Sequence, residues 1–145
     1  MNHIIYFNCK KLSANASDAI AEYAKRLSAY CKTRWYCKPA KDVSALSAVL
    51  TPSAHTLWIS VLPGESSLTS EELARHLEQI GIQGISTLCF FIGYPMKNQT
   101  CDTDIQIPVT LSLSSMDISP ELTGVILYEQ LYRSYRILHH QPYHK

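Results

Sequence analysis

The stretch Ile85-Ser-Thr-Leu-Cys-Phe-Phe-Ile92 is a short, almost continuous apolar run, and Gly93-Tyr94-Pro95 follows it directly. Its length and its β-branched and aromatic residues predict a buried strand that stops at the glycine. A glycine in this position lets the backbone approach a ligand closely. A plain turn, however, is the simpler explanation of Gly93 taken alone.

Strand-like and helix-like segments alternate on both sides of this run. Further strands are predicted at 3–9, 33–37, 56–62 and 109–113, and helices at 16–31, 43–50, from Thr69 to about 80, and 120–138. Thr69 and Glu72 have the spacing of a capping box, and Pro120 suits the first turn of a helix. This alternation predicts an α/β fold in one domain over 1–145, with a mostly parallel sheet covered by helices.

Ligands bind beyond the carboxyl ends of the strands in sheets of this class. The segments 62–66, 93–99 and 114–119 are therefore the candidates for the functional site. The chain has no G-x-G-x-x-G pattern and no P-loop, so nucleotide phosphate binding of those types is not supported.

Composition limits the class of protein further. Hydrophobic residues make up 46% of the chain and charged residues 17%, which excludes a disordered or collagen-like chain. No apolar run approaches the roughly 20 residues of a membrane span. The beginning of the chain does not have the pattern of a secretory signal, so we expect a cytoplasmic protein without membrane association.

The net charge is only +1, but its distribution is uneven. Residues 1–41 carry eight Lys and Arg against two acids, 42–130 carry two against ten, and 131–145 carry three and no acid. Two basic ends around an acidic middle suit a polyanionic partner if the fold brings the ends together. Ordinary scatter of solvated charge explains the pattern equally well.

The cysteines and the C-terminal tail are the segments with the residue types of metal and proton chemistry. The five cysteines form no C-x-x-C pair, so small core residues are expected rather than a disulfide framework or a zinc site. In the tail, three histidines and Tyr143 lie close to Arg133, Arg136 and Lys145. Such residues move protons or contact nucleic acid, although a disordered terminus is the simplest alternative. We expect no metal site there, because the tail has no carboxylate or cysteine to complete one.

Several stretches resemble the RlmH family of SPOUT-class methyltransferases. They lie in the family's order along nearly the whole chain: Glu22-Tyr-Ala-Lys-Arg-Leu-Ser-Ala-Tyr30, Ser70-Glu-Glu-Leu-Ala74, Phe91-Ile-Gly93, Leu111-Ser-Leu-Ser-Ser-Met116, Val125-Ile-Leu-Tyr-Glu-Gln-Leu-Tyr-Arg133 and Gln141-Pro-Tyr-His-Lys145. The resemblance implies a SPOUT-type parallel sheet with a C-terminal trefoil knot. It also implies methylation of a ribosomal RNA pseudouridine at N3 with S-adenosylmethionine as cofactor.

The resemblance also implies a homodimer with a composite site, and a heterodimer with a second family member stays open. The motifs carry over candidate roles. Cofactor contacts are expected from the residues at the three strand ends: Val61, Leu62, Gly93, Tyr94, Leu113, Ser114, Ser115, Met116, Asp117 and Ile118. RNA contacts are expected from Arg133, Arg136, His140 and Lys145. Tyr143 and His144 are the expected catalytic residues. The apolar residues of 120–138 face more than one side of a helix, which predicts a dimer formed through this segment.

Two departures from the family pattern leave a second hypothesis open. In the glycine-rich loop, this chain has Tyr94 and Lys97 where the family has two glycines. After the 111–116 motif, it has Pro120 and Gly124 where the family has a histidine and an arginine. The alternative is therefore a paralogue with altered or lost catalysis that keeps the dimer and binds RNA or another substrate. The Tyr94 ring is expected either to occupy the adenosine volume or to stack on the adenine.

Overall fold

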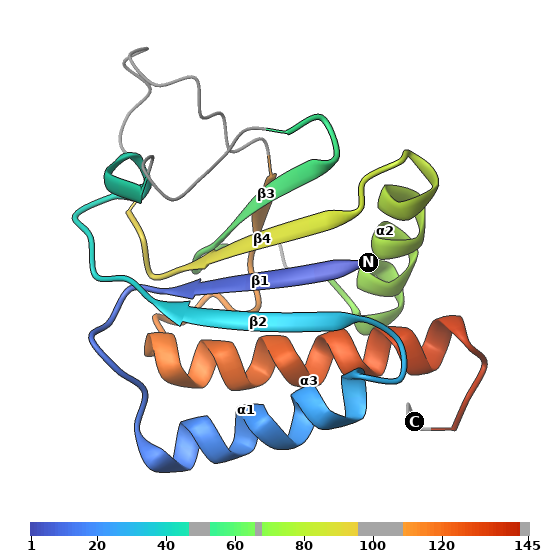
Figure 1. Ribbon diagram of the computed structural model, residues 1–145, viewed down its shortest axis with the longest axis horizontal. Helices are drawn as coiled ribbons and strands as arrows, with labels where there is room; N and C mark the ends of the chain where they lie inside the picture. The colour runs from blue at the N-terminus through green and yellow to red at the C-terminus, as the bar shows by residue number, and fades with distance from the viewer. Residues whose placement is uncertain (47–52, 66–67, 96–108, 143–145) are drawn as a thin grey trace.

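The computed structural model describes residues 1–46, 53–65, 68–95 and 109–142. The described residues form five strands, three α-helices and one short 3-10 turn (Figure 1). In order they are β1 (Asn2–Phe7), α1 (Ala14–Leu27), β2 (Lys32–Cys37), a 3-10 turn η1 (Val43–Leu46), β3 (Thr56–Val61), α2 (Ser70–Ile82), β4 (Thr87–Ile92), β5 (Val109–Leu111) and α3 (Pro120–Leu138).

The strands form one parallel sheet in the order β2-β1-β4-β3-β5. The predicted parallel α/β architecture is thereby confirmed. The register aligns Phe7 with Cys37 and Ile92, and Ile92 with Val61, which in turn pairs with Leu111. All five strands therefore end at the same edge of the sheet, where the loops after β3, β4 and β5 meet.

The three α-helices pack on one face of the sheet. The main core contains the inward side chains of the strands together with α1, α2 and α3, and Ile5, Phe90, Leu127 and Leu131 are all almost completely buried. A smaller aromatic cluster lies on the opposite face. It contains Tyr6, Trp58, Cys89, Phe91 and Tyr94, with Val43 and Leu46 of η1 over them.

Helix α3 crosses the middle of the helical layer and explains why its sequence is apolar on several sides. It packs between α1 and α2 and contacts β1 and β4 (Figure 1). Leu131 is completely buried and Tyr135 packs against the core, whereas Leu122 is 52% exposed. Much of the apolar surface that predicted a dimer is thus covered within one chain.

One close approach fixes α3 against the sheet. An added Cβ at Gly124 would lie 2.1 Å from Cε1 and 2.4 Å from Cζ of the buried Phe7 ring. Ordinary carbon contacts are about 3.5–4.0 Å, so a side chain at position 124 does not fit this packing. A residue larger than glycine at position 124 would therefore require the Phe7 ring or α3 to move.

A buried polar pair also joins β1 to α3. His3 is completely buried, and its Nε2 lies 2.7 Å from the Tyr135 hydroxyl. Burial lowers the pKa of His3 to about 3, with a smaller contribution from the positive N-terminus. The imidazole is therefore neutral in the folded protein near pH 7.

Most predicted boundaries lie close to the observed ones. Both bonds of the capping box are formed: Glu72 N donates to Thr69 Oγ1 at 3.2 Å, and Thr69 N donates to Glu72 Oε2 at 2.7 Å. Pro120 occupies the first turn of α3, with Ser119 as its N-cap. The short helix predicted at 43–50 is observed as η1, and 47–50 lie outside the described residues.

Candidate functional site

A cleft of about 280 Å³ opens at the carboxyl ends of β3 and β4. Its volume is close to the lower end of the range for small-molecule sites. Its lining comes from the two strand ends, the loop after β5 and the first turn of α3: Val61, Leu62, Pro63, Ile92, Gly93, Pro95, Leu113, Ser114, Met116, Asp117, Ile118, Pro120 and Thr123.

The cleft brings together most of the residues that were expected to bind cofactor. Eight of the ten line it: Val61, Leu62, Gly93, Leu113, Ser114, Met116, Asp117 and Ile118. Ser115 and Tyr94 are not part of the lining. Three segments distant in sequence therefore form one surface, as the shared edge of a parallel sheet predicts.

Gly93 has a conformation and an environment that favour glycine. Its φ is +81°, and an added Cβ would lie 3.1 Å from Pro120 Cγ. The Gly93 carbonyl accepts a 2.9 Å hydrogen bond from Asn8 Nδ2, and Asn8 Oδ1 accepts one from Ala40 N at 3.0 Å. The glycine loop is therefore held between the end of β1 and the start of α3.

The loop after β5 is also fixed by hydrogen bonds. Leu62 N donates to Leu111 O at 3.1 Å, and Gly64 N donates to Ser114 O at 3.1 Å. Met116 N donates to Ser114 Oγ at 3.0 Å, which closes a short turn. Met116 is 73% exposed, so an apolar side chain stands open to solvent at the mouth of the cleft.

The Tyr94 ring lies in neither of the two expected places. The side chain is completely buried in the aromatic cluster on the sheet face opposite the α-helices, where it makes an edge contact with Phe91 at 6.1 Å between ring centroids. Its hydroxyl donates a 2.6 Å hydrogen bond to the Lys38 carbonyl, and burial raises its pKa. The ring therefore turns to the opposite face of the sheet and does not line the cleft, and a contact between Tyr94 and the cofactor stays a prediction that this geometry does not favour.

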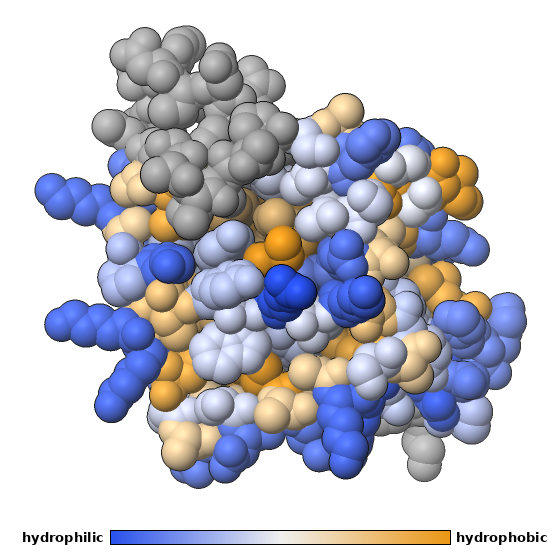
Figure 2. All heavy atoms as spheres, viewed as in Figure 1, coloured by the Kyte–Doolittle hydropathy of each residue, from blue (hydrophilic) through white to orange (hydrophobic). Residues whose placement is uncertain are grey.

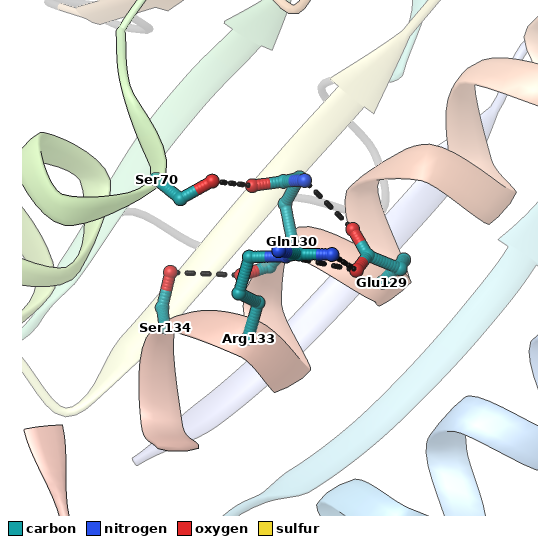
Figure 3. A network of polar contacts seen from close by, with 5 residues as sticks. All are labelled: Ser70, Glu129, Gln130, Arg133 and Ser134. Atoms are coloured by element: carbon teal, nitrogen blue, oxygen red, sulfur yellow. Dashed lines mark hydrogen bonds and ion pairs between the residues drawn. The ribbon is translucent and has the colours of Figure 1, made fainter. Parts of the chain in front are cut away.

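The basic residues that were expected to bind RNA lie near the other end of α3. Arg133 is 13 residues from Pro120, or about 20 Å along the helix. Its Nη2 and Nε donate to Glu129 Oε1 at 2.7 and 3.0 Å, within a network that also contains Ser70, Gln130 and Ser134 (Figure 3). Arg133 thus already has a carboxylate partner.

The described part of the tail folds back on α1 and α3. Arg136 donates to Gln141 Oε1 at 3.0 Å and to the Pro142 carbonyl at 2.9 Å, and Tyr30 also bonds Gln141. His140 is exposed and has a φ of +53°. Tyr143, His144 and Lys145 lie outside the described residues.

Five lining residues were not among the expected cofactor contacts, although Pro63 and Pro95 lie within the candidate segments 62–66 and 93–99. Pro63, Ile92, Pro95, Pro120 and Thr123 all contribute to the cleft. A signal existed for Pro120, since the first turn of a helix that follows a candidate ligand loop is itself close to the ligand. Among the residues that the structure describes, no group of three or more His, Cys, Asp or Glu side chains is suited to hold a metal ion. Likewise, no helix in the described ranges is long and apolar enough to span a membrane.

The fold is that of a parallel α/β protein, with a cleft at the carboxyl edge of its sheet. The family model described as "Predicted SPOUT methyltransferase" matches residues 1–144, and the chain belongs to this family. SPOUT methyltransferases use S-adenosylmethionine.

Curated relatives cover the same length. The chain is 33% identical to "Ribosomal RNA large subunit methyltransferase H 1" of Thermoanaerobacter sp. (strain X514), over all of both chains. It is 32% identical to "Ribosomal RNA large subunit methyltransferase H" of Exiguobacterium sp., over 88% of this chain and 89% of the relative. It is 33% identical to "Putative ribosomal RNA large subunit methyltransferase H" of Methanococcus maripaludis, over 89% and 90%.

The chemistry of the cleft fits the cofactor of this family. Leu113, Met116 and Ile118 offer apolar surface for a flat heterocycle, and Ser114 offers a hydroxyl. Among the lining residues that the structure describes, Asp117 alone carries a carboxylate. An anionic group suits a cofactor that carries positive charge.

Proposed function

We propose that this chain is an S-adenosylmethionine-dependent methyltransferase that acts on RNA of the large ribosomal subunit. The family membership and the names of the full-length relatives support this proposal. The observation that carries it is the cleft, because its lining unites eight residues that the family motifs predict for the cofactor. A ribosomal substrate would be met in the cytoplasm.

Each part of the cleft has a role in this proposal. When bound, S-adenosylmethionine supplies an electrophilic methyl group on its sulfonium. Leu113 and Ile118 would cover the heterocycle, Asp117 would favour the cationic portion, and Gly93 would let the backbone approach closely. Most of the rate enhancement then comes from orienting the acceptor toward the methyl group.

The proposed acceptor is N3 of a pseudouridine, as the RlmH resemblance implies. This nitrogen carries a proton that must be removed, and His144 or Tyr143 is the candidate for that step. Both residues lie outside the described part of the chain. The proposal therefore includes a direct test of these two side chains by substitution.

We further propose that the protein acts as a dimer and that its C-terminal part forms the trefoil knot implied by the family. The supporting geometry is the separation within one chain: the cleft adjoins the start of α3, whereas Arg136 and the tail adjoin its end. A second chain would supply its own tail to the cleft. Leu122 and Met116, 52% and 73% exposed, stand near that cleft as candidate contacts.

A catalytically altered paralogue remains the second candidate. Pro120 and Gly124 favour it, because they replace the family's histidine and arginine. The buried position of Tyr94 weighs against it, since this substituted side chain does not enter the cleft.

Calorimetric titration of S-adenosylmethionine into the purified protein separates the two candidates. We expect binding by the wild type and a loss of about tenfold or more in Ile118→Trp, because the indole would fill the cleft. Ser115→Trp is the matched control, since Ser115 is an exposed residue of the same loop that does not line the cleft. Absence of binding by the wild type would refute the proposed cofactor use.

A further inference from the structure

A second hollow lies at the opposite edge of the sheet from β5, between α1 and the edge strand β2. It is a shallow groove of about 810 Å³. Its lining shares no residue with the cleft: Ala21, Ala24, Lys25, Ser28, Cys31, Lys32, Thr33, Arg34, Trp35, Tyr36 and Tyr128. The proposed methyltransferase function gives this groove no role so far.

The groove is positively charged. Its described lining contains Lys25, Lys32 and Arg34 and no carboxylate, and all three cations belong to a basic stretch of sequence. Residues 23–41 contain six Lys and Arg and no Asp or Glu. Lys32 and Arg34 are exposed, and a row of exposed cations along one groove attracts a polyanion.

An exposed aromatic ring stands beside these cations. Tyr36 is 39% exposed and stacks on Tyr6 at 5.6 Å between centroids, and Tyr6 stacks on Phe91 at 5.5 Å. In the view shared by Figures 1 and 2, near-neutral and hydrophilic side chains lie together over β1 and β2, and no described helix crosses in front of these strands. A ring held in a stack offers a rigid surface on which a nucleic-acid base can stack.

The charge pattern favours RNA over a second copy of the chain. Another β2 pairing along this edge would set Lys32 and Arg34 against like charges, which destabilises strand pairing. The edge strand is also close enough to the cleft for one ligand to reach both. Two strand spacings, about 10 Å, separate the end of β2 from the end of β4, which Gly93 follows, and Lys32 lies five residues, or about 17 Å, back along β2 from that edge.

We propose that this groove and the adjoining exposed face of β2 bind a single-stranded segment of RNA that crosses the edge of the sheet, with backbone phosphates on Lys25, Lys32 and Arg34 and a base stacked on Tyr36, whose ring lies on the face opposite α1. The inference rests on the proposed function, in which RNA is the substrate. The groove would hold nucleotides that flank the methylated one and so align the acceptor with the cleft.

Fluorescence anisotropy with a labelled oligouridylate of about 12 nucleotides tests the charge contribution. We expect Arg34→Glu to raise the Kd at least fivefold, because the substitution removes one phosphate contact and places a negative charge beside the RNA. Arg75→Glu is the matched control, because Arg75 is an exposed arginine on α2 and undergoes the same change of charge. It should change the Kd less than about twofold.

Two substitutions at Tyr36 test the stacking contribution. Tyr36→Ala should weaken probe binding about fivefold or more, and Tyr36→Phe should stay within about twofold, because phenylalanine keeps the aromatic face. Circular dichroism and cofactor titration on the same variants show whether the fold and the cleft are intact.

Three results would contradict the proposal that this groove binds RNA. Equal weakening by Arg34→Glu and Arg75→Glu would show binding by general charge, and an unchanged Kd in Arg34→Glu would show binding elsewhere. A shift in oligomeric mass with Arg34→Glu, without a change in probe binding, would assign the groove to a second copy. If the wild type bound no cofactor but still bound the probe through the groove, the proposed methyltransferase function would be refuted and the proposed RNA site would be supported.

Discussion

Gly124→Ala is the most direct test of how α3 is seated on the sheet. The added methyl carbon would lie 2.1 and 2.4 Å from two carbons of the Phe7 ring, more than 1 Å inside ordinary contact. Phe7 is completely buried, so the ring has no open space into which it can move. Overpacking of this kind costs about 3 kcal/mol, and the better helix propensity of alanine returns about 1 kcal/mol.

We therefore expect Gly124→Ala to lower the free energy of unfolding by about 2 kcal/mol, or the Tm by roughly 4–8 °C. Urea denaturation of Gly124→Ala, Phe7→Leu and the double variant measures the effect and its origin. Because leucine removes the ring, the double variant should be more stable than the sum of the single losses by at least about 1 kcal/mol. Additive losses, or a stabilised Gly124→Ala, would refute the argument.

Three further predictions concern the buried histidine, the cleft carboxylate and the buried tyrosine. Burial lowers the pKa of His3 in the folded protein to about 3, so its contribution to stability is complete above pH 6.5 and is lost as the pH falls toward 3. Across that pH range, the wild type should lose on the order of 4 kcal/mol more free energy of unfolding than His3→Gln, as measured by urea denaturation. Asp117→Asn should weaken S-adenosylmethionine binding about fivefold in calorimetry, whereas Glu78→Gln on the exposed side of α2 should leave it unchanged. Tyr94→Phe should lower the free energy of unfolding by about 1 kcal/mol, because it removes the hydrogen bond to the Lys38 carbonyl, and should leave cofactor affinity within about twofold.

Local signals in the sequence predicted much of the fold. Thr69 and Glu72 marked the start of α2 because a capping box is a short-range pattern, and Pro120 marked α3 for the same reason. The run at 85–92 predicted a buried strand from its own composition. The strand order was not predictable in this way, since parallel strands are joined by long crossovers that carry no register signal.

The site was predictable as a set of loops and much less so in its details. The shared carboxyl edge of a parallel sheet placed Leu62, Gly93 and Ser114 together. The position of the Tyr94 ring was not predictable from the sequence, because its hydrogen-bond partner, the Lys38 carbonyl, is 56 residues away. The reason for Gly124 was hidden similarly, because it depends on contact with Phe7.

The measurement that tests the central claim most directly is mass spectrometry of large-subunit ribosomal RNA from a strain that lacks this chain. The account predicts the loss of one methylated pseudouridine, restored by the wild-type chain and not by Ile118→Trp, whose indole fills the cleft. An RNA methylation pattern identical to that of the parent strain would contradict it.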